Sequence, residues 1–170
     1  SFFTPASERP WIIDCGANIG VSVLEWKTRW PQSRIICFEP DPFAFSLLKM
    51  NVDRNDIPEI ECLNLALAES DGMATLYGDV ASGGDARGNS IDAAWGDRAG
   101  SVQTSVACRR LSRYVADREV SFLKIDIEGA EERVLTEIAP HLGNVQAVYV
   151  DPVNPGGLSS SNGVKVTIRP

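Results

Sequence analysis

The chain has 170 residues, 44% of them hydrophobic and 23% charged, a globular composition that excludes disordered and collagen-like classes. Its net charge is −7 and it contains no long Lys/Arg run, so we expect no nucleic-acid partner held by phosphate neutralisation. Because no apolar run has the length of a transmembrane helix and residues 1–10 lack a signal-peptide pattern, we expect a cytoplasmic protein with no membrane partner. The sequence does not indicate an oligomeric state.

From residue 11 to about residue 152, short apolar runs alternate with helical patterns. This alternation is typical of βαβ units, and it predicts one α/β domain, a Rossmann-like three-layer αβα sandwich with a mostly parallel sheet. The expected strands span residues 11–15, 34–38, 60–67, 72–77, 102–107, 120–127, 146–150 and 164–168. Helices are expected after the first strand, after Asp41 as N-cap, over residues 111–115 and over residues 129–142, with Gly143 as a C-cap.

Two segments have no periodicity. Residues 79–100 are rich in Gly, Asp, Ala and Ser, which predicts a flexible loop or an active-site cover. Residues 152–163 are rich in Pro, Gly, Ser and Asn, which predicts a linker before the last strand.

The four cysteines lie in or beside apolar runs and form no C-x-x-C pair. We expect them to be small buried hydrophobic residues in a reducing compartment. With His141 as the single histidine, a zinc site is not expected.

A glycine-rich turn, Asp14-Cys15-Gly16-Ala17-Asn18-Ile19-Gly20, joins the first strand to the first helix. Glycines allow the backbone to bend tightly and a ligand to approach its N–H groups. The spacing differs from the Gly-x-Gly-x-x-Gly of dinucleotide sites, and an acid at Asp14 suits the ammonium group of a methionine moiety better than a pyrophosphate. The alternative is a strand–helix turn that binds no ligand.

Glu39 ends the second strand within Phe38-Glu39-Pro40-Asp41. A carboxylate at this position can accept hydrogen bonds from both hydroxyls of a ribose, which NAD and S-adenosylmethionine share. The alternative is a solvated loop acid. For Asp41, the helix cap is the favoured interpretation.

The fourth strand leads into Phe122-Leu123-Lys124-Ile125-Asp126-Ile127-Glu128-Gly129-Ala130-Glu131. With the two motifs above, and with Asn64-Leu65-Ala66-Leu67 followed by Asp71-Gly72, this segment closely resembles the FkbM family of methyltransferases. The resemblance covers residues 11–149. It implies a class I fold and methyl transfer from S-adenosylmethionine to a hydroxyl group of a polyketide, sugar or other glycan.

The resemblance also implies roles for individual residues. The methionine side of the cofactor would be held by Asp14, Gly16, Ala17, Asn18 and Gly20. Glu39 would hold the ribose, Pro40 and Asp41 would lie beside the adenosine, and Asn64 and Ala66 near the adenine.

The chain departs from the family pattern at three places. Leu111-Ser112 replaces the usual Leu-Asp, and Val150-Asp151-Pro152 stands where Glu-x-His is frequent. Class I methyltransferases also usually end with a helix and two further strands, so either the chain is shortened at its C-terminal end or part of a longer natural sequence is absent.

Alternation along the fourth strand puts Lys124, Asp126 and Glu128 on one face, with the two acids reaching the carboxyl edge of the sheet. Asp126 could act as the base that takes the acceptor's proton. Asp126 and Glu128 could instead hold a divalent cation, which the sequence allows but does not indicate. In the structural alternative, Glu128 caps the following helix and Lys124 is its ion partner.

Asn89 and Ser90, in the predicted loop, could contact the acceptor, although a polar turn explains them equally well. The sequence therefore predicts an S-adenosylmethionine-dependent O-methyltransferase. Two alternatives remain: a nicotinamide-dependent oxidoreductase, and a cofactor-binding module of a larger synthase without activity of its own.

Overall fold

A six-stranded sheet forms the centre of the computed structural model, which describes residues 3–78, 89–92, 102–151 and 164–167. The strand order is β3-β2-β1-β7-β8-β9, and every neighbouring pair is parallel except β8 and β9. The strands are β1 (Trp11–Cys15), β2 (Arg34–Phe38), β3 (Ile60–Leu63), β7 (Val120–Ile125), β8 (Val145–Val150) and β9 (Val164–Thr167). The predicted α/β architecture with a mostly parallel sheet is confirmed.

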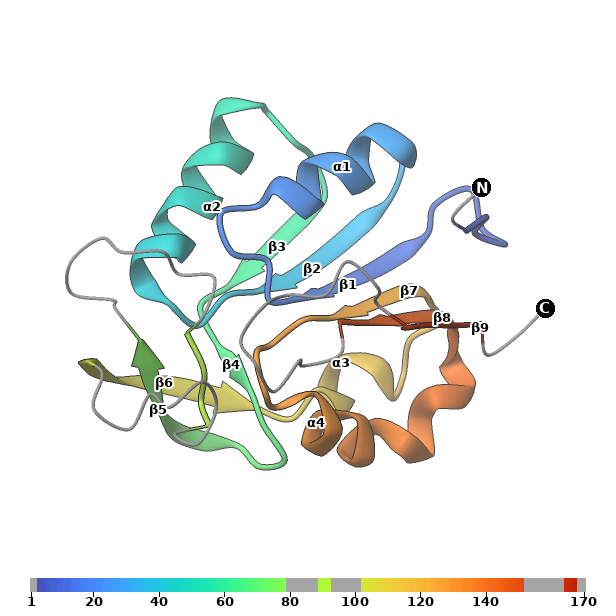
Figure 1. Cartoon of the computed structure of the whole chain (residues 1–170). Helices are drawn as coiled ribbons and strands as arrows, with labels where there is room; N and C mark the ends of the chain where they lie inside the picture. Colours follow the sequence, from blue (N-terminus) through green and yellow to red (C-terminus); the bar gives the residue numbers. More distant parts are fainter. Residues whose placement is uncertain (1–2, 79–88, 93–101, 152–163, 168–170) are drawn as a thin grey trace.

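Helices cover both faces of this sheet (Figure 1). One face carries α1 (Val21–Arg29) and α2 (Pro42–Arg54); the other carries α3 (Ser112–Val115), α4 (Glu131–Ile138) and a 3₁₀ segment, η3 (Ala139–Asn144). Side chains alternate along each strand, so Ile12 and Phe122 are buried towards α1 and α2, whereas Ile13 and Leu123 are buried towards α4. Two hydrophobic cores therefore enclose the sheet.

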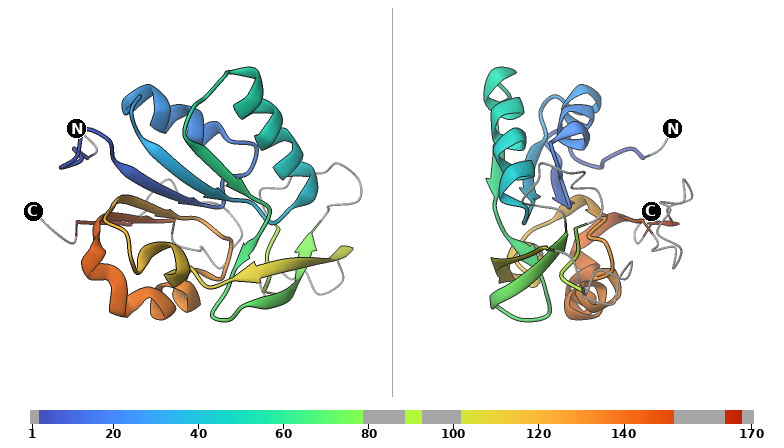
Figure 2. Two further views of the ribbon diagram at one scale, coloured as in Figure 1. Left: turned by 180° about the vertical axis from the view of Figure 1, so that it is seen from behind. Right: turned by 60° about the vertical axis from the view of Figure 1, so that its left-hand side comes forward.

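A second, three-stranded sheet lies at one end of the first (Figure 2). It contains β4 (Ala66–Leu67), β5 (Gly72–Gly78) and β6 (Val102–Arg109) in the order β4-β6-β5. The single strand expected over residues 60–67 is thus wrong, because the chain leaves the main sheet after Leu63. The side-chain amide of Asn64 donates hydrogen bonds to the carbonyls of Glu39 (2.8 Å) and Pro40 (3.1 Å), which anchors this point of departure.

Two further boundaries differ from expectation. The helix expected over residues 129–142 ends at Ile138 and continues as η3, because Pro140 has no N–H to extend the α-helical ladder. Gly143, expected as a C-cap, lies inside η3. The expected loop 79–100 and linker 152–163 fall largely outside the described residues; within 89–92, Ser90 pairs with Tyr77.

The chain order places a topological switch point, and with it an expected crevice, between β1 and β7. After β1 the chain passes to α1 on one face, and after β7 it passes to α4 on the opposite face. In open α/β sheets, ligands bind outside the carboxyl ends of the strands at such a switch point. The site is therefore expected where Cys15 and Ile125, which are paired in register, end their strands.

Replacing Gly16 with alanine should destabilise the protein more than the same change at Gly72. Both residues have positive φ (+84° and +153°), so both variants incur a backbone cost of about 1–2 kcal/mol. Only at Gly16 would the new Cβ also meet a backbone atom, the Asp126 carbonyl oxygen at 1.8 Å, whereas Gly72 has open space. Urea denaturation should show a loss of about 3 kcal/mol or more for Gly16→Ala. Equal losses in the two variants would contradict the close approach of β1 and β7.

Candidate active site

The glycine-rich bend is attached to both neighbouring strands by its backbone. The N–H groups of Gly16 and Ala17 donate to the carbonyl of Phe38 at 3.1 and 2.9 Å, and the N–H of Asp126 donates to the carbonyl of Cys15 at 3.1 Å. Gly20, at φ +91°, lies so close to Leu48 that a Cβ would be 2.7 Å from its Cδ1 atom. Gly16 is therefore required by its close approach to the backbone of Asp126, and Gly20 is favoured by its positive φ, independently of any ligand.

Glu39 connects the end of β2 to this bend. Its Oε2 accepts a hydrogen bond from the N–H of Asn18 at 2.8 Å, and its Oε1 accepts one from the N–H of Asp41 at 2.9 Å. The side chain is buried, with 7% of the residue exposed. Each carboxylate oxygen can accept a second hydrogen bond, so the group still offers two acceptor positions.

The environment of Glu39 favours its neutral form. Burial raises the pKa of its carboxyl group to about 7, although the hydrogen bonds from Asp41 and Asn18 oppose the shift. A ligand that donates hydrogen bonds to this carboxylate would therefore bind with release of a proton near neutral pH.

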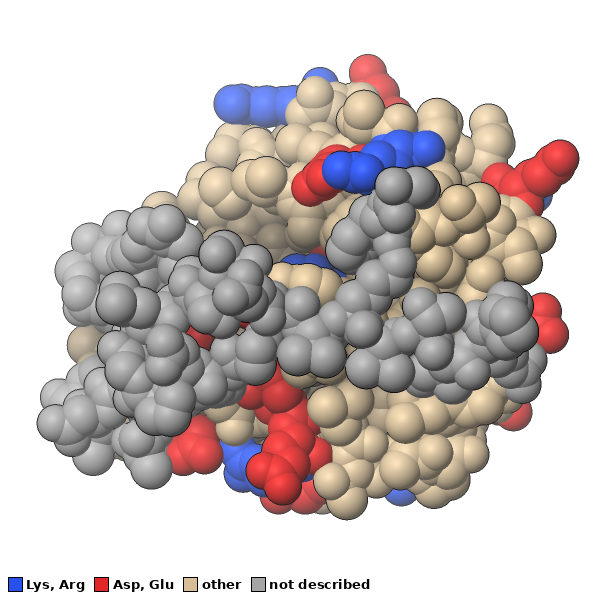
Figure 3. Space-filling model, turned by 45° about the vertical axis from the view of Figure 1, so that its right-hand side comes forward, with Lys and Arg blue, Asp and Glu red and all other residues tan. Residues whose placement is uncertain are grey.

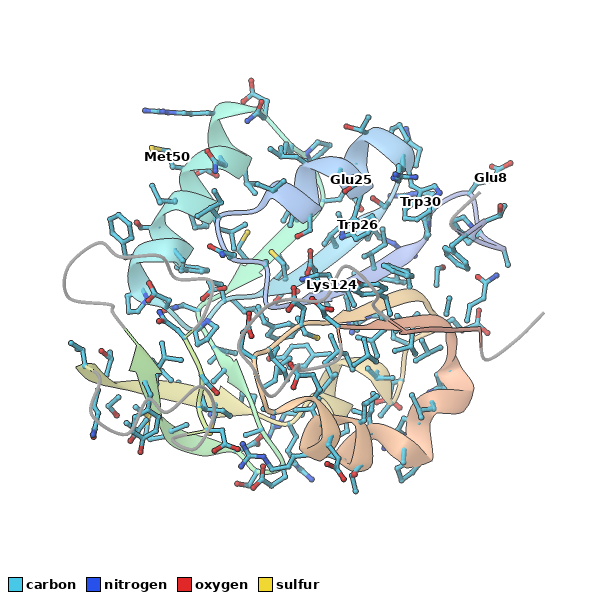
Figure 4. All side chains as sticks on the ribbon, in the orientation of Figure 1. Glu8, Glu25, Trp26, Trp30, Met50 and Lys124 are labelled. Atoms are coloured by element: carbon cyan, nitrogen blue, oxygen red, sulfur yellow. The ribbon has the colours of Figure 1, made fainter. Side chains whose placement is uncertain are left out.

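Lys124 forms the ionic centre of the site. Its Nζ lies 3.2 Å from Oδ1 of Asp14 and 3.2 Å from Oδ2 of Asp126, and it donates a hydrogen bond to the carbonyl of Gly16 at 2.9 Å. Burial alone would lower the pKa of this ammonium group, but the carboxylates of Asp14 and Asp126 outweigh burial and raise it. Figure 4 shows Lys124 at the centre of the molecule, below Trp26. The ammonium group is therefore charged, and it joins β1 to β7.

Asp14 lies beneath the bend, on the side of the sheet that α1 covers. It is 0% exposed, and its Oδ2 accepts a hydrogen bond from the indole Nε1 of Trp26 at 3.2 Å. A direct pair with a ligand ammonium would need an exposed carboxylate oxygen, which this arrangement does not provide. The structure places Asp14 where it holds Lys124.

Asp126 and Glu128 do not share one strand face, and this part of the prediction is wrong. β7 ends at Ile125, and Glu128 lies in the following turn with φ +54°. The alternative in which Lys124 is the ion partner of Glu128 is also wrong, because Lys124 pairs with Asp14 and Asp126. Of the two acids, Asp126 adjoins the bend, and its side chain is 33% exposed.

Glu131, rather than Glu128, satisfies the turn before α4. Its carboxylate accepts hydrogen bonds from the N–H groups of Ile127 (3.0 Å) and Gly129 (2.8 Å). Burial raises the pKa of Glu131 despite these bonds. No role was predicted for Glu131 from the sequence, although a helix-capping pattern with an acid in the first turn could have indicated it.

The residues that were expected beside the adenosine lie at two separate places. Asp41 caps α2, as favoured from the sequence, because its Oδ1 accepts from the N–H groups of Phe43 and Ala44, each at 2.8 Å. Asn64, which holds the carbonyls of Glu39 and Pro40, lies at the same corner. Ala66 does not join this corner, since it is buried in the core of the smaller sheet.

Asn89 and Ser90 connect the two sides of the crevice. Nδ2 of Asn89 donates to Oδ2 of Asp41 at 2.7 Å, and the buried hydroxyl of Ser90 donates to the carbonyl of Glu128. Both polar groups therefore already bind protein atoms at the two corners.

Four buried side-chain oxygens among the described residues accept no hydrogen bond: Oδ1 of Asp14, Oγ of Ser33, Oδ1 of Asn89 and Oδ1 of Asp151. Asp14 is paired with Lys124, and Ser33 precedes β2 at the opposite edge of the sheet, which leaves Asn89 and Asp151 for a ligand at the carboxyl edge. An unpaired buried acceptor is costly, so these atoms suit a ligand that carries hydroxyl or ammonium donors. With the two acceptor positions of Glu39, they fit the ribose and hydroxyl chemistry that the sequence predicts. The described residues contain no group of three or more His, Cys, Asp or Glu that could hold a metal ion.

Acidic side chains gather in the lower centre of the face in Figure 3, with basic ones beside them. Together with the net charge of −7, this distribution disfavours anionic partners on that face. No helix in the described part of the chain is long and apolar enough to cross a bilayer.

Comparison with known proteins identifies related sequences and folds. The sequence model of the methyltransferase FkbM domain matches residues 14–150. Methyltransferase sdnD of Sordaria araneosa is 29% identical over 177 residues, covering 88% of this chain and 68% of that protein. Methyltransferase 1 of Beauveria bassiana (strain ARSEF 2860) is 30% identical over 152 residues, covering 77% and 59%. The chain thus spans about two thirds of the first relative and less of the second.

Among solved structures, precorrin-6y C5,15-methyltransferase from Geobacter metallireducens GS-15 has a similar fold. Its TM-score is 0.50 at 10% sequence identity, covering 86% of this chain and 55% of that one. The predicted fold class, that of class I methyltransferases, is confirmed.

Replacing Lys124 with methionine should destabilise the protein by about 3–5 kcal/mol, because Asp14 would remain buried without its cation. In the Lys124→Met background, Asp14→Asn should restore part of this loss of stability. Urea denaturation of the unchanged protein, the two single variants and the double variant measures the coupling energy between the two side chains. Lys49→Met is the matched control: its pair with Asp53 is exposed and should contribute about 1 kcal/mol or less. Independent, additive effects of the two site substitutions would contradict the buried ion pair.

Proposed function

Because the chain belongs to the FkbM family of methyltransferases, we propose that it binds S-adenosylmethionine at the carboxyl edge of its sheet and methylates a hydroxyl group. The acceptor class is a small molecule, sugar or polyketide. The observation that carries this proposal is the buried carboxylate of Glu39, attached to the glycine-rich bend through Asn18 and still able to accept two hydrogen bonds. When bound, the cofactor supplies an electrophilic methyl group on a sulfonium.

In this proposal, different parts of the cofactor contact different residues of the site. Glu39 accepts the ribose hydroxyls, and the backbone of residues 16–20, which includes Ala17, Asn18 and Gly20, faces the methionine moiety. The corner of Pro40 and Asp41, fastened by Asn64, lies beside the adenosine. Asp14 contributes through Lys124, which holds the Gly16 carbonyl in place.

The acceptor lies on the β7 side of the crevice in this proposal. Asp126 is the part-exposed carboxylate that adjoins the bend, and its pair with Lys124 fixes its position. It is therefore suited to align an acceptor hydroxyl for in-line attack. Glu128 follows in the next turn, where Ser90 holds its carbonyl, and Asn89 borders the opposite corner. Glu128 and Ser90 thus shape the acceptor side, and Asn89, next to Ser90, connects it with the adenosine corner at Asp41.

Calorimetric titration with S-adenosylhomocysteine and with NADH tests the proposal. We expect a micromolar dissociation constant for the first ligand and no binding of the second, because the bend lacks the pyrophosphate spacing and Glu39 suits the ribose. Glu39→Ala should weaken S-adenosylhomocysteine binding about 10- to 100-fold, because it removes hydrogen bonds between the ligand and a charged group. Binding of NADH alone would favour the oxidoreductase. Cofactor binding without methyl transfer to any hydroxyl compound would favour the inactive module.

The affinity for S-adenosylhomocysteine should depend on pH through Glu39. Ribose hydroxyls donate to the ionised carboxylate, and the pKa of about 7 means that a proton must leave before binding at lower pH. Affinity should therefore fall about tenfold per pH unit below pH 7 and level off above it. In Glu39→Gln, affinity should be lower and nearly independent of pH between 6 and 8. Parallel pH profiles for the two proteins would show that Glu39 does not contact the ligand.

A further inference from the structure

The residue after β8 lies beside the residue after β7. The two strands pair in parallel register, with Lys124 opposite Tyr149 and Ile125 opposite Val150, and the N–H of Asp151 donates to the carbonyl of Ile125 at 3.0 Å. In register, neighbouring residues of parallel strands point to the same face, so Asp126 and Asp151 continue the rows that begin at Lys124 and Tyr149. Two carboxylates thus meet at this edge.

The two carboxylates have different partners. Oδ2 of Asp126 lies 3.2 Å from the ammonium group of Lys124. Oδ1 of Asp151 is buried, and within the described part of the chain it accepts no hydrogen bond. Protonation of Asp126 would cancel its attraction to Lys124, whereas protonation of Asp151 would relieve the burial of an unpaired charge. Asp151 is therefore the better proton acceptor of the two.

The charges around Asp151 agree with this difference. Burial raises the pKa of Asp151, the charge of Asp126 raises it further, and Lys124 opposes them. Burial also raises the pKa of Tyr149, with added contributions from Asp151 and Asp126, so the phenol belongs to the same cluster. Two neighbouring acids in different environments can take separate roles in one reaction.

We infer that Asp151 removes the proton of the acceptor hydroxyl, while Asp126, held by Lys124, aligns that hydroxyl. This inference rests on the proposed function and assigns the proton transfer, first expected of Asp126, to its neighbour. The O–H bond breaks, and the proton goes to Oδ1 of Asp151. The oxygen forms a bond to the methyl carbon, and the electron pair of the broken S–CH₃ bond stays on sulfur. The proton later leaves Asp151 for solvent.

The first experiment measures methyl transfer from S-adenosyl-L-[methyl-³H]methionine to three hydroxyl probes: methyl α-D-glucopyranoside, myo-inositol and catechol. Asp151→Asn should reduce turnover about 100-fold or more, the usual contribution of a general base, and should bind S-adenosylhomocysteine as tightly as the unchanged protein. With S-adenosylmethionine saturating at every pH, so that Glu39 does not affect the rate, the turnover of the unchanged protein should rise with pH as Asp151 ionises, and this rise should be absent in Asp151→Asn. The matched control is Asp117→Asn, an exposed acid at the opposite edge of the sheet, which should keep both rate and profile.

The second experiment needs no acceptor. With [4-¹³C]aspartate incorporated, NMR titration follows each carboxyl group, and Asp151→Asn assigns the signal of Asp151. We expect Asp151 to titrate above the ordinary aspartate value of about 3.9, and to shift back towards that value in Asp126→Asn.

The outcomes separate the two proposals. An ordinary titration of Asp151, or undiminished turnover in Asp151→Asn, would overturn the inference while the methyltransferase function stands. If the unchanged protein binds no S-adenosylhomocysteine, or binds it and methylates none of the three probes, the result counts against the proposed function. The inference about Asp151 then fails together with the proposed function on which it rests.

Discussion

The ammonium group of Lys124 is the interaction on which the site depends. A fully buried carboxylate such as Asp14 is tolerated only with a compensating cation, and Lys124 provides it from the neighbouring strand. The same ammonium group binds the carbonyl of Gly16 and the carboxylate of Asp126. One charge thus connects the strand before the glycine-rich bend with the strand that carries the acceptor-side acids. Their relative position is set by electrostatics as well as by the β-ladder.

The bend itself is shaped by the protein around it. Gly16 leaves room for the Asp126 carbonyl, Gly20 leaves room for Leu48, and the Phe38 carbonyl binds the N–H groups of the bend. Glu39 adds a side-chain connection through Asn18. Because these contacts form without a ligand, the proposed binding surface is organised in advance, and little ordering has to accompany binding.

The sequence predicted the elements that local patterns determine. Short apolar runs located β1, β2, β7 and β8, and the Asp41-Pro42 pair correctly marked the start of α2. The departure of the chain after Leu63 was missed, because it depends on a hydrogen bond from Asn64 to carbonyls far away in sequence. Asp126 and Glu128 were grouped by an alternation that the end of β7 interrupts. The neighbourhood of Asp126 and Asp151 follows from strand register, which short-range periodicity does not reveal.

The hydrogen bond from the indole of Trp26 to Asp14 gives the protein a built-in optical probe. The emission of an indole depends on the electric field along its ring, and here the N–H points at the buried carboxylate of Asp14, the first residue of the glycine-rich turn. Trp30 stacks on Trp26 at a centroid distance of 5.9 Å, which couples the two chromophores. The intrinsic fluorescence of Trp26 therefore reports on the environment of Asp14 at the base of the crevice, and no added label is needed.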